Sequence, residues 1–214
     1  MDKISVIIRC RNEEAHIGIS IQSVLDQFDN PEIIIIDNQS SDESMKVVSL
    51  FDRCNITKYS LNDNYTPGKA LNFGAEKASN NSLLVLSAHS QLTKLNKVKL
   101  SQDLNKYVAV FGQQTPIYRG KKITPRYIWS HFKENSSINM YSEIEERPFL
   151  HNAFCFYNRQ ALIDHPFDEL LQGKEDRYWA IDVVDKGYSY LYDGINYKCN
   201  HFWTTNGATW RGLG

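Results

Sequence analysis

The chain contains 214 residues, carries a formal net charge of −1 and has a mean hydropathy of −0.47. The length allows one large α/β domain with a substantial core, and the balanced charge indicates no general attraction to nucleic acid. No apolar run approaches the ~20 residues of a membrane-spanning helix, and because a strand-like run begins at Ile4 we do not expect a signal peptide. Four irregularly spaced cysteines indicate reduced thiols. We therefore expect a cytoplasmic protein, with attachment to the inner face of the membrane left open.

Strand-like and helix-like segments alternate at the start of the chain. Apolar runs predict strands over residues 4–8, 32–37 and 56–61. Between the first two, apolar side chains recur at helical spacing from Ile17 to Phe28, and the preceding Asn12-Glu13-Glu14 predicts a helix start with acidic residues in its first turn. A second helix is expected to begin at Ser41-Asp42-Glu43. This alternation predicts an α/β domain whose central sheet is mostly parallel and flanked by helices.

The pattern continues less regularly in the remaining chain. Pro67-Gly68 predicts a turn before a helix that reaches residues 76–78, and residues 83–86 predict a fourth strand. The other expected segments are a basic surface helix at 94–105, strands at 107–111 and 154–157, an irregular aromatic-rich insertion at 113–148, a helix from Glu175 and a partly mobile tail at 193–214.

Three predicted strands end in polar clusters. Residues 83–86 lead into Ser87-Ala88-His89-Ser90, residues 4–8 lead into Arg9-Cys10-Arg11-Asn12, and residues 33–36 lead into Asp37-Asn38-Gln39-Ser40. In an open α/β sheet, ligands bind in a crevice at the carboxyl ends of the strands. We therefore expect these clusters to converge on one ligand site.

The second and third of these clusters, with two later motifs, resemble family 2 glycosyltransferases of the GT-A fold, which is Rossmann-like. The family's Asp-Asp-Gly-Ser-x-Asp turn corresponds to Asp37-Asn38-Gln39-Ser40-Ser41-Asp42, and its first turn corresponds to Arg11-Asn12-Glu13-Glu14. The likeness continues through Gly68-Lys69-Ala70-Leu71-Asn72-Phe73-Gly74 and Glu175-Asp176-Arg177-Tyr178-Trp179, and covers residues 4–201. Each motif is weak alone, but four in the same order are fairly specific.

The resemblance implies an enzyme that transfers a sugar, with inversion, from a nucleotide-sugar donor to a hydroxyl of a saccharide or lipid-linked saccharide. Bacterial surface polysaccharide biosynthesis, such as capsule or O-antigen assembly, is the implied setting. One continuous domain is expected, with a nucleotide-sugar-binding half at residues 1–112 and an acceptor-binding half at residues 113–214. Aromatic side chains at 113–141 and at Trp203 and Trp210 suit stacking on sugar faces.

The resemblance also assigns the donor site. Asp37 would accept a hydrogen bond from the nucleotide base, and the alternative is a turn residue that closes on its own backbone. Asp42 is expected to be a helix N-cap. Lys69 either offsets phosphate charge or is a solvated surface lysine, with neither favoured. The implied donor-binding residues are Arg9, Arg11, Asn12, Glu14, Asp37, Asn38, Lys69, Asn72, Ser87, His89, His201 and Arg211.

Asp176 is the implied catalytic base. Displacement at an anomeric carbon with inversion needs one group to take the acceptor proton, so one carboxylate suffices. The adjacent Glu175 is expected to raise the basicity of the pair if both are buried. The alternative is an ordinary acidic pair at a helix start, where the helix dipole favours negative charge. Trp179, one turn later, is expected to serve packing.

The chain departs from the family at Ser87-Ala88-His89, where the family usually has Asp-x-Asp to hold Mg²⁺ or Mn²⁺. His201 resembles a histidine that often completes the family's metal site, and the alternative is a loop histidine with no ligand. We predict that no metal is required, although Mn²⁺ or Mg²⁺ stays possible and the metal ligands are unknown. Two other functions are open. A sugar nucleotidyltransferase would normally have a glycine-rich loop where residues 9–14 have no glycine. A non-catalytic nucleotide-sugar-binding module is the third reading.

Overall fold

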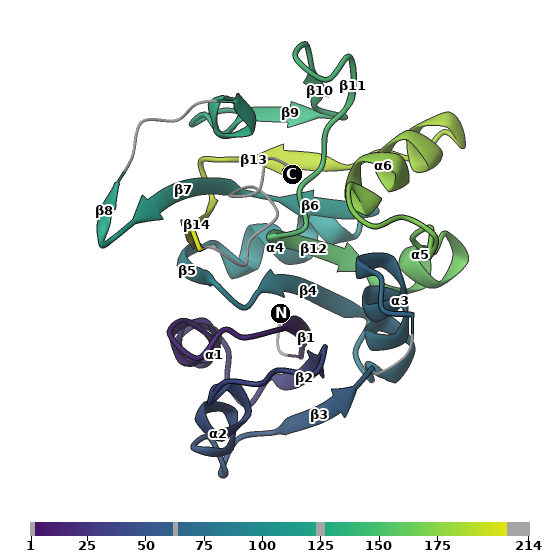
Figure 1. Ribbon diagram of the computed structural model, residues 1–214. Helices are drawn as coiled ribbons and strands as arrows, with labels where there is room; N and C mark the ends of the chain where they lie inside the picture. The colour runs from purple at the N-terminus through teal and green to yellow at the C-terminus, as the bar shows by residue number, and fades with distance from the viewer. Residues whose placement is uncertain (1–2, 62–63, 123–126, 205–214) are drawn as a thin grey trace.

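The computed structural model describes residues 3–61, 64–122 and 127–204. Its main feature is an eight-stranded sheet with helices on both faces (Figure 1). In spatial order the strands are β3 (Ile56–Ser60), β2 (Glu32–Asp37), β1 (Ser5–Cys10), β4 (Ser82–Ser87), β12 (Phe154–Asn158), β6 (Ala109–Phe111), β13 (Leu191–Asp193) and β9 (Ser136–Ile138). Strands from both sides of residue 112 share this sheet, so the two expected halves are joined in one core.

The first four strands of the chain are parallel, as the alternating pattern predicted. β1 pairs with β2 and β4, and its end is level with theirs because Cys10 lies opposite Asp37 and Arg9 lies opposite Ser87. β12 runs antiparallel to β4 and β6. An antiparallel strand begins where its neighbours end, so the residues just before Phe154 lie beside the end of β4. The Ser87 N–H accordingly donates to the carbonyl of Ala153 at 3.0 Å.

Two apolar clusters cover the two faces of the sheet. α3 (Pro67–Lys77), α5 (Arg159–Asp164) and α6 (Glu175–Asp185) pack on one face, where Leu71, Leu162 and Trp179 are buried. α1 (Ile17–Leu25), α2 (Ser44–Ser49) and α4 (Lys97–Leu104) pack on the other, where Ile21 and Leu100 are buried. The strands between them are buried on both sides, which explains their continuous apolar runs.

A second sheet lies beside the first and was not predicted. Its order is β5 (Ser90–Leu95), β14 (Tyr197–Phe202), β7 (Gln113–Tyr118) and β8 (Lys121–Lys122). The expected helix at 94–105 is therefore shorter, because its first residues belong to β5. The prediction of a tail at 193–214 is wrong for Tyr197–Phe202, which form strand β14. Residues 205–214 lie outside the described residues.

The insertion at 113–148 is also more regular than expected. Besides β7, β8 and β9 it contains a 3-10 helix (Tyr127–His131) and the short hairpin of β10 (Tyr141–Ser142) and β11 (Arg147–Pro148). These strands are short and several pair with distant segments, as β7 does with β14. Pairing of this kind leaves no periodic signal in the local sequence.

Three helix starts differ from prediction. α1 begins at Ile17 without acidic residues in its first turn, because the N–H groups of Glu13 and Glu14 donate to Ser44 and Asp42 across the sheet edge. α2 begins at Ser44 with Glu43 as its N-cap residue, so Asp42 is not the N-cap, although its carboxylate accepts from the Ser44 N–H at 3.0 Å. Pro67-Gly68 is the first turn of α3 rather than a separate turn, because Thr66 caps the helix and proline suits its first position.

Within the described residues, no helix is both long and apolar enough to cross a bilayer. All four cysteines are free thiols, as their irregular spacing predicted. Burial raises the pKa of Cys10 to about 11. That thiol therefore stays protonated near neutral pH.

Candidate functional site

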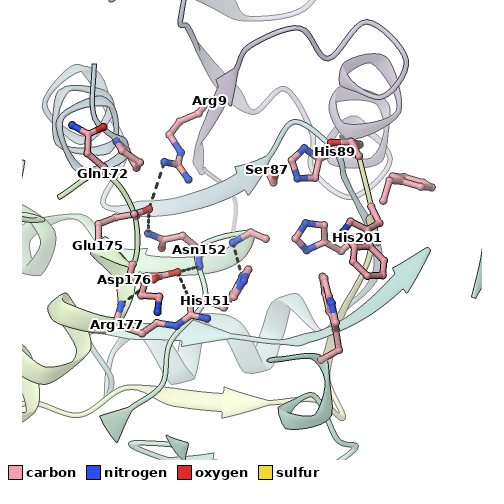
Figure 2. Close-up of a pocket in the computed structure, with 18 residues that line it drawn as sticks. Arg9, Ser87, His89, His151, Asn152, Gln172, Glu175, Asp176, Arg177 and His201 are labelled. Atoms are coloured by element: carbon pink, nitrogen blue, oxygen red, sulfur yellow. Dashed lines mark hydrogen bonds and ion pairs between the residues drawn. The ribbon is translucent and has the colours of Figure 1, made fainter. Parts of the chain in front are cut away.

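A cleft opens where β1 and β4 end and where β12 and α6 begin (Figure 2). Its empty volume is about 840 Å³, which includes space open to solvent. The residues that line it are Arg9, Pro67, Ser87, His89, Trp129, His151, Asn152, Ala153, Gln172, Gly173, Lys174, Glu175, Asp176, Arg177, His201, Phe202, Trp203 and Thr204. Of the predicted site residues, the cleft brings together Arg9, Ser87, His89, Glu175, Asp176 and His201.

Asp176 lies at the N-terminus of α6 and is only 5% exposed. Its Oδ2 accepts from the Asn152 N–H at 2.8 Å and from Arg177 Nη1 at 2.8 Å, and its Oδ1 accepts from the Arg177 N–H at 2.9 Å. A carboxylate has about four acceptor positions. These three donors therefore fix the orientation of Asp176 and leave one position on Oδ1 for a ligand.

Glu175 is equally buried but is held more loosely. Its Oε1 lies 3.5 Å from Arg9 Nη1 and accepts from Asn152 Nδ2 at 3.4 Å. Burial raises the pKa of Glu175 above its ordinary value, the nearby Arg9 opposes this effect, and the neighbouring Asp176 adds to it. Both carboxylates are buried, which is the condition that the sequence analysis set for its expectation about this pair.

Three histidines line the other part of the cleft, and we call His89, His151 and His201 the histidine wall. The rings of His89 and His201 lie side by side with their centroids 5.0 Å apart (Figure 2). Burial lowers the pKa of both His151 and His201 well below the ordinary histidine value, and neighbouring basic groups add to the effect. Both rings are therefore neutral near neutral pH. His201 lies in β14, so it is not a loop histidine.

The residues described do not fit the family's carboxylate site for a divalent cation. Mg²⁺ prefers several oxygen ligands, whereas the segment at the end of β4 supplies Ser87 and His89. Among residues 3–61, 64–122 and 127–204, no three His, Cys, Asp or Glu side chains are arranged to hold a metal ion. The nearby carboxylate of Glu13 instead pairs with His89 at 2.8 Å.

The side chains of the turns after β1 and β2 form hydrogen bonds within and between these two turns. Asp37 accepts from the Ser40 N–H at 3.2 Å and from the Ser40 hydroxyl at 2.6 Å, as the alternative of a self-closing turn anticipated. Asn12 Oδ1 accepts from the Ser41 N–H at 2.7 Å, and Glu14 Oε2 accepts from the Glu43 N–H at 2.9 Å. Asn12 and Glu14 line a second pocket that meets the cleft at Thr204.

Helix α3 contributes less to the cleft than the resemblance implied. Asn72 donates from Nδ2 to the Phe167 carbonyl and accepts at Oδ1 from the Phe167 N–H, each at 2.9 Å. Neither Asn72 nor Lys69 lines the cleft, and the same is true of Arg11, Asp37 and Asn38. Arg211 and Trp210 lie outside the described residues. Trp179 packs edge-on against Tyr157 with centroids 5.1 Å apart, which confirms its structural role.

Several residues of the cleft were not predicted. His151 and Asn152 precede the buried run that becomes β12, and a polar pair next to a buried strand is a usable signal. This pair is recognised as part of the cleft only when β12 is known to be antiparallel, because the residues before β12 then lie beside the end of β4. Gln114 lies between His151 and His201 without lining the cleft, and no local pattern marks it.

Known structures share the fold. The chain matches S. aureus TarS in complex with UDP-GlcNAc at 20% identity and a TM-score of 0.71, with 96% of this chain and 60% of that chain covered. It matches GalNAc-T7 with UDP, GalNAc and Mn²⁺ at 17% identity and a TM-score of 0.72, covering 96% and 44%. A mannosyltransferase from Pyrobaculum calidifontis, in complex with GDP-Man and Mn²⁺, matches at 16% identity and a TM-score of 0.71, covering 97% and 59%. The chain thus spans less than two thirds of the length of each of these proteins.

These likenesses confirm the predicted GT-A fold and, at such low identity, support nothing finer. No curated protein sequence matches the chain significantly. The profile described as glycosyl transferase family 2 matches residues 5–165, which is most of the chain. The chain therefore belongs to glycosyl transferase family 2.

Proposed function

We propose that this protein is an inverting glycosyltransferase that uses a nucleotide-sugar donor. The observation that supports this best is the buried carboxylate pair Glu175 and Asp176 at the start of α6, which lines the same cleft as Arg9 and Ser87 at the ends of β1 and β4. The similar structures hold UDP-GlcNAc, UDP with GalNAc, and GDP-Man, which are donors or their parts.

Asp176 is the proposed general base. Its Oδ1 has a lone pair free to take the proton of the hydroxyl group on the acceptor substrate. As the proton leaves, the hydroxyl oxygen attacks the anomeric carbon of the donor from the side opposite the nucleotide. The bond to the nucleotide phosphate breaks and the configuration inverts. Arg9, held near Glu175 at 3.5 Å, adds positive charge to the donor side of the cleft.

The proposed division of labour follows the chain. Residues 1–112 supply the donor side, with Asp37 at the nucleotide base, and residues 113–214 supply the base and the acceptor side. A saccharide or lipid-linked saccharide of a bacterial surface polysaccharide is the proposed acceptor, met at the membrane face of the cytoplasm. Trp129, Phe202 and Trp203 in the cleft suit stacking on such sugars.

Asp176→Asn tests the base. The substitution keeps the shape of the side chain, so we expect an intact fold and unchanged nucleotide affinity by calorimetry, but a turnover lowered by ~10²–10⁴-fold. Asp182→Asn is the matched control, because Asp182 lies in the same helix and pairs with Lys186 at the surface. Turnover of Asp176→Asn close to that of Asp182→Asn would remove Asp176 from the mechanism.

A donor panel tests the reaction. UDP-, GDP-, dTDP- and CMP-sugars are incubated with the protein, and release of nucleotide and of free or transferred sugar is measured. Sugar release from one donor supports a glycosyltransferase. Pyrophosphate release from a nucleoside triphosphate and a sugar phosphate would favour a nucleotidyltransferase, and donor binding without turnover would favour a binding module.

A further inference from the structure

Gln114 is a buried amide that connects two members of the histidine wall. It lies in β7 with 2% of its surface exposed. Its Nε2 is 3.2 Å from Nδ1 of His151, and its Oε1 is 3.0 Å from Nδ1 of His201. One amide side chain therefore sets the hydrogen-bonding state of two rings that line the cleft.

A backbone group determines which way these hydrogen bonds run. The Ala153 N–H lies 3.3 Å from Nδ1 of His151, and a backbone N–H can only donate. Nδ1 of His151 must therefore be an acceptor without a proton. The atom of Gln114 that faces it must then be the NH₂ donor, so the Gln114 carbonyl oxygen faces His201. Because that oxygen only accepts, Nδ1 of His201 must carry a proton.

Nδ1 of His89 also carries a proton, and a different group holds it. Its Nδ1 lies 2.8 Å from Oε1 of Glu13, and a carboxylate oxygen accepts a proton donor. In all three rings these contacts use only Nδ1. In the two neutral rings Nε2 is consequently a lone-pair acceptor in His201 and an N–H donor in His151.

We propose that Gln114 is a positioning residue that fixes opposite tautomers in His151 and His201, so that the histidine wall offers a donor from His151 and an acceptor from His201 to a hydroxyl-bearing ligand. This pattern suits the hydroxyl groups of a sugar, which donate and accept together, and that ligand assignment rests on the proposed function. Burial keeps His151 and His201 neutral, so their tautomers rather than their charges determine which groups they bind.

The tautomers are measured directly and without substrate. Long-range ¹H–¹⁵N correlation spectra of the ¹⁵N-labelled protein distinguish a protonated ring nitrogen from a bare one, and His89→Gln, His151→Gln and His201→Gln assign the signals. We expect the Nδ1–H form for His201, the Nε2–H form for His151 and a proton on Nδ1 of His89. The Nδ1–H form in His151, or the Nε2–H form in His201, would overturn the proposal even if the protein proves to be a transferase.

The Gln114→Met variant should change the tautomer of His201 without changing that of His151. It removes the hydrogen-bond partner of Nδ1 of His201, whereas the Ala153 N–H still holds His151, so we expect mixed tautomers in His201 and unchanged Nε2–H in His151. Gln113→Met is the matched control, since Gln113 is adjacent in β7 and donates to the Phe132 carbonyl instead. It should leave all three rings unchanged.

Activity provides a second readout. We expect Gln114→Met to lower sugar-transfer turnover about tenfold, the size of effect typical of losing an orienting partner, with Gln113→Met near the wild-type rate. Unchanged tautomers in a folded Gln114→Met protein would refute the role of Gln114. Should that variant fail to fold, the wild-type spectra still decide the proposal, because a single wrong tautomer contradicts it.

Discussion

Asn72→Ala is expected to damage stability rather than nucleotide binding. Asn72 is 8% exposed, and its amide is hydrogen-bonded to both backbone groups of Phe167, which is itself 2% exposed. Alanine would leave the Phe167 N–H and carbonyl buried without partners. Each such loss costs about 1–3 kcal/mol. Because the two groups relax together, we expect the free energy of unfolding to fall by about 2–4 kcal/mol.

Urea unfolding followed by circular dichroism measures this change, and calorimetry measures nucleotide affinity in the same variant. Asn105→Ala is the matched control, because Asn105 is exposed at the end of α4 and should lose less than ~0.5 kcal/mol. A loss below ~1 kcal/mol in Asn72→Ala, together with weaker nucleotide binding, would refute the structural reading. That result would return Asn72 to the donor site that the family resemblance assigned to it.

Two further predictions concern the cleft. Since Ser87 and His89 supply no carboxylate for a hard cation, sugar transfer should persist in excess EDTA, and His89→Ala should lower turnover more than the chelator does. Loss of activity in EDTA with rescue by Mn²⁺ would contradict this. The raised pKa of Glu175 means that this carboxyl group binds a proton more tightly in the folded protein than in the unfolded chain. The stability that it contributes is therefore present at low pH and is lost as the pH rises above ~4.3, the pKa of glutamate in the unfolded chain. Glu175→Gln should therefore gain unfolding free energy relative to wild type between pH 4 and pH 7 in urea titrations, and a constant difference would show that Glu175 titrates normally.

The strands buried on both faces were predictable because of their chemistry. Residues 33–36 are four isoleucines, and all of them are buried in the sheet. Such a strand has no exposed face, so its sequence does not alternate between apolar and polar residues, and the apolar composition alone identifies it. The helix at Glu175 was predictable for a related reason, since acidic residues at a helix N-terminus are favoured by the dipole.

The second sheet was unpredictable because its strands depend on distant partners. Tyr197–Phe202 lies between β5 and β7, which are about a hundred residues earlier in the chain. Its burial alternates along the strand, yet the glycine- and asparagine-rich composition around it suggested a tail. Local sequence also did not reveal the hydrogen bonds of Asp37, Asn12 and Glu14: Asp37 accepts from Ser40 in its own turn, whereas Asn12 and Glu14 accept from N–H groups of the turn after β2.

The geometry of the cleft depends on the three consecutive residues that immediately precede β12. The His151 ring, the Asn152 N–H and the Ala153 carbonyl respectively hold Gln114, Asp176 and the end of β4. Their spacing is set by the backbone, and β12 is itself paired on both sides by β4 and β6. The Asp176 carboxylate is hydrogen-bonded to this segment and the His151 imidazole belongs to it, so one segment positions both groups. Reactions of this kind lose rate steeply when the reacting groups are displaced by about 1 Å. The antiparallel direction of this one strand, which no residue pattern revealed, is therefore what joins the proposed base to the histidine wall.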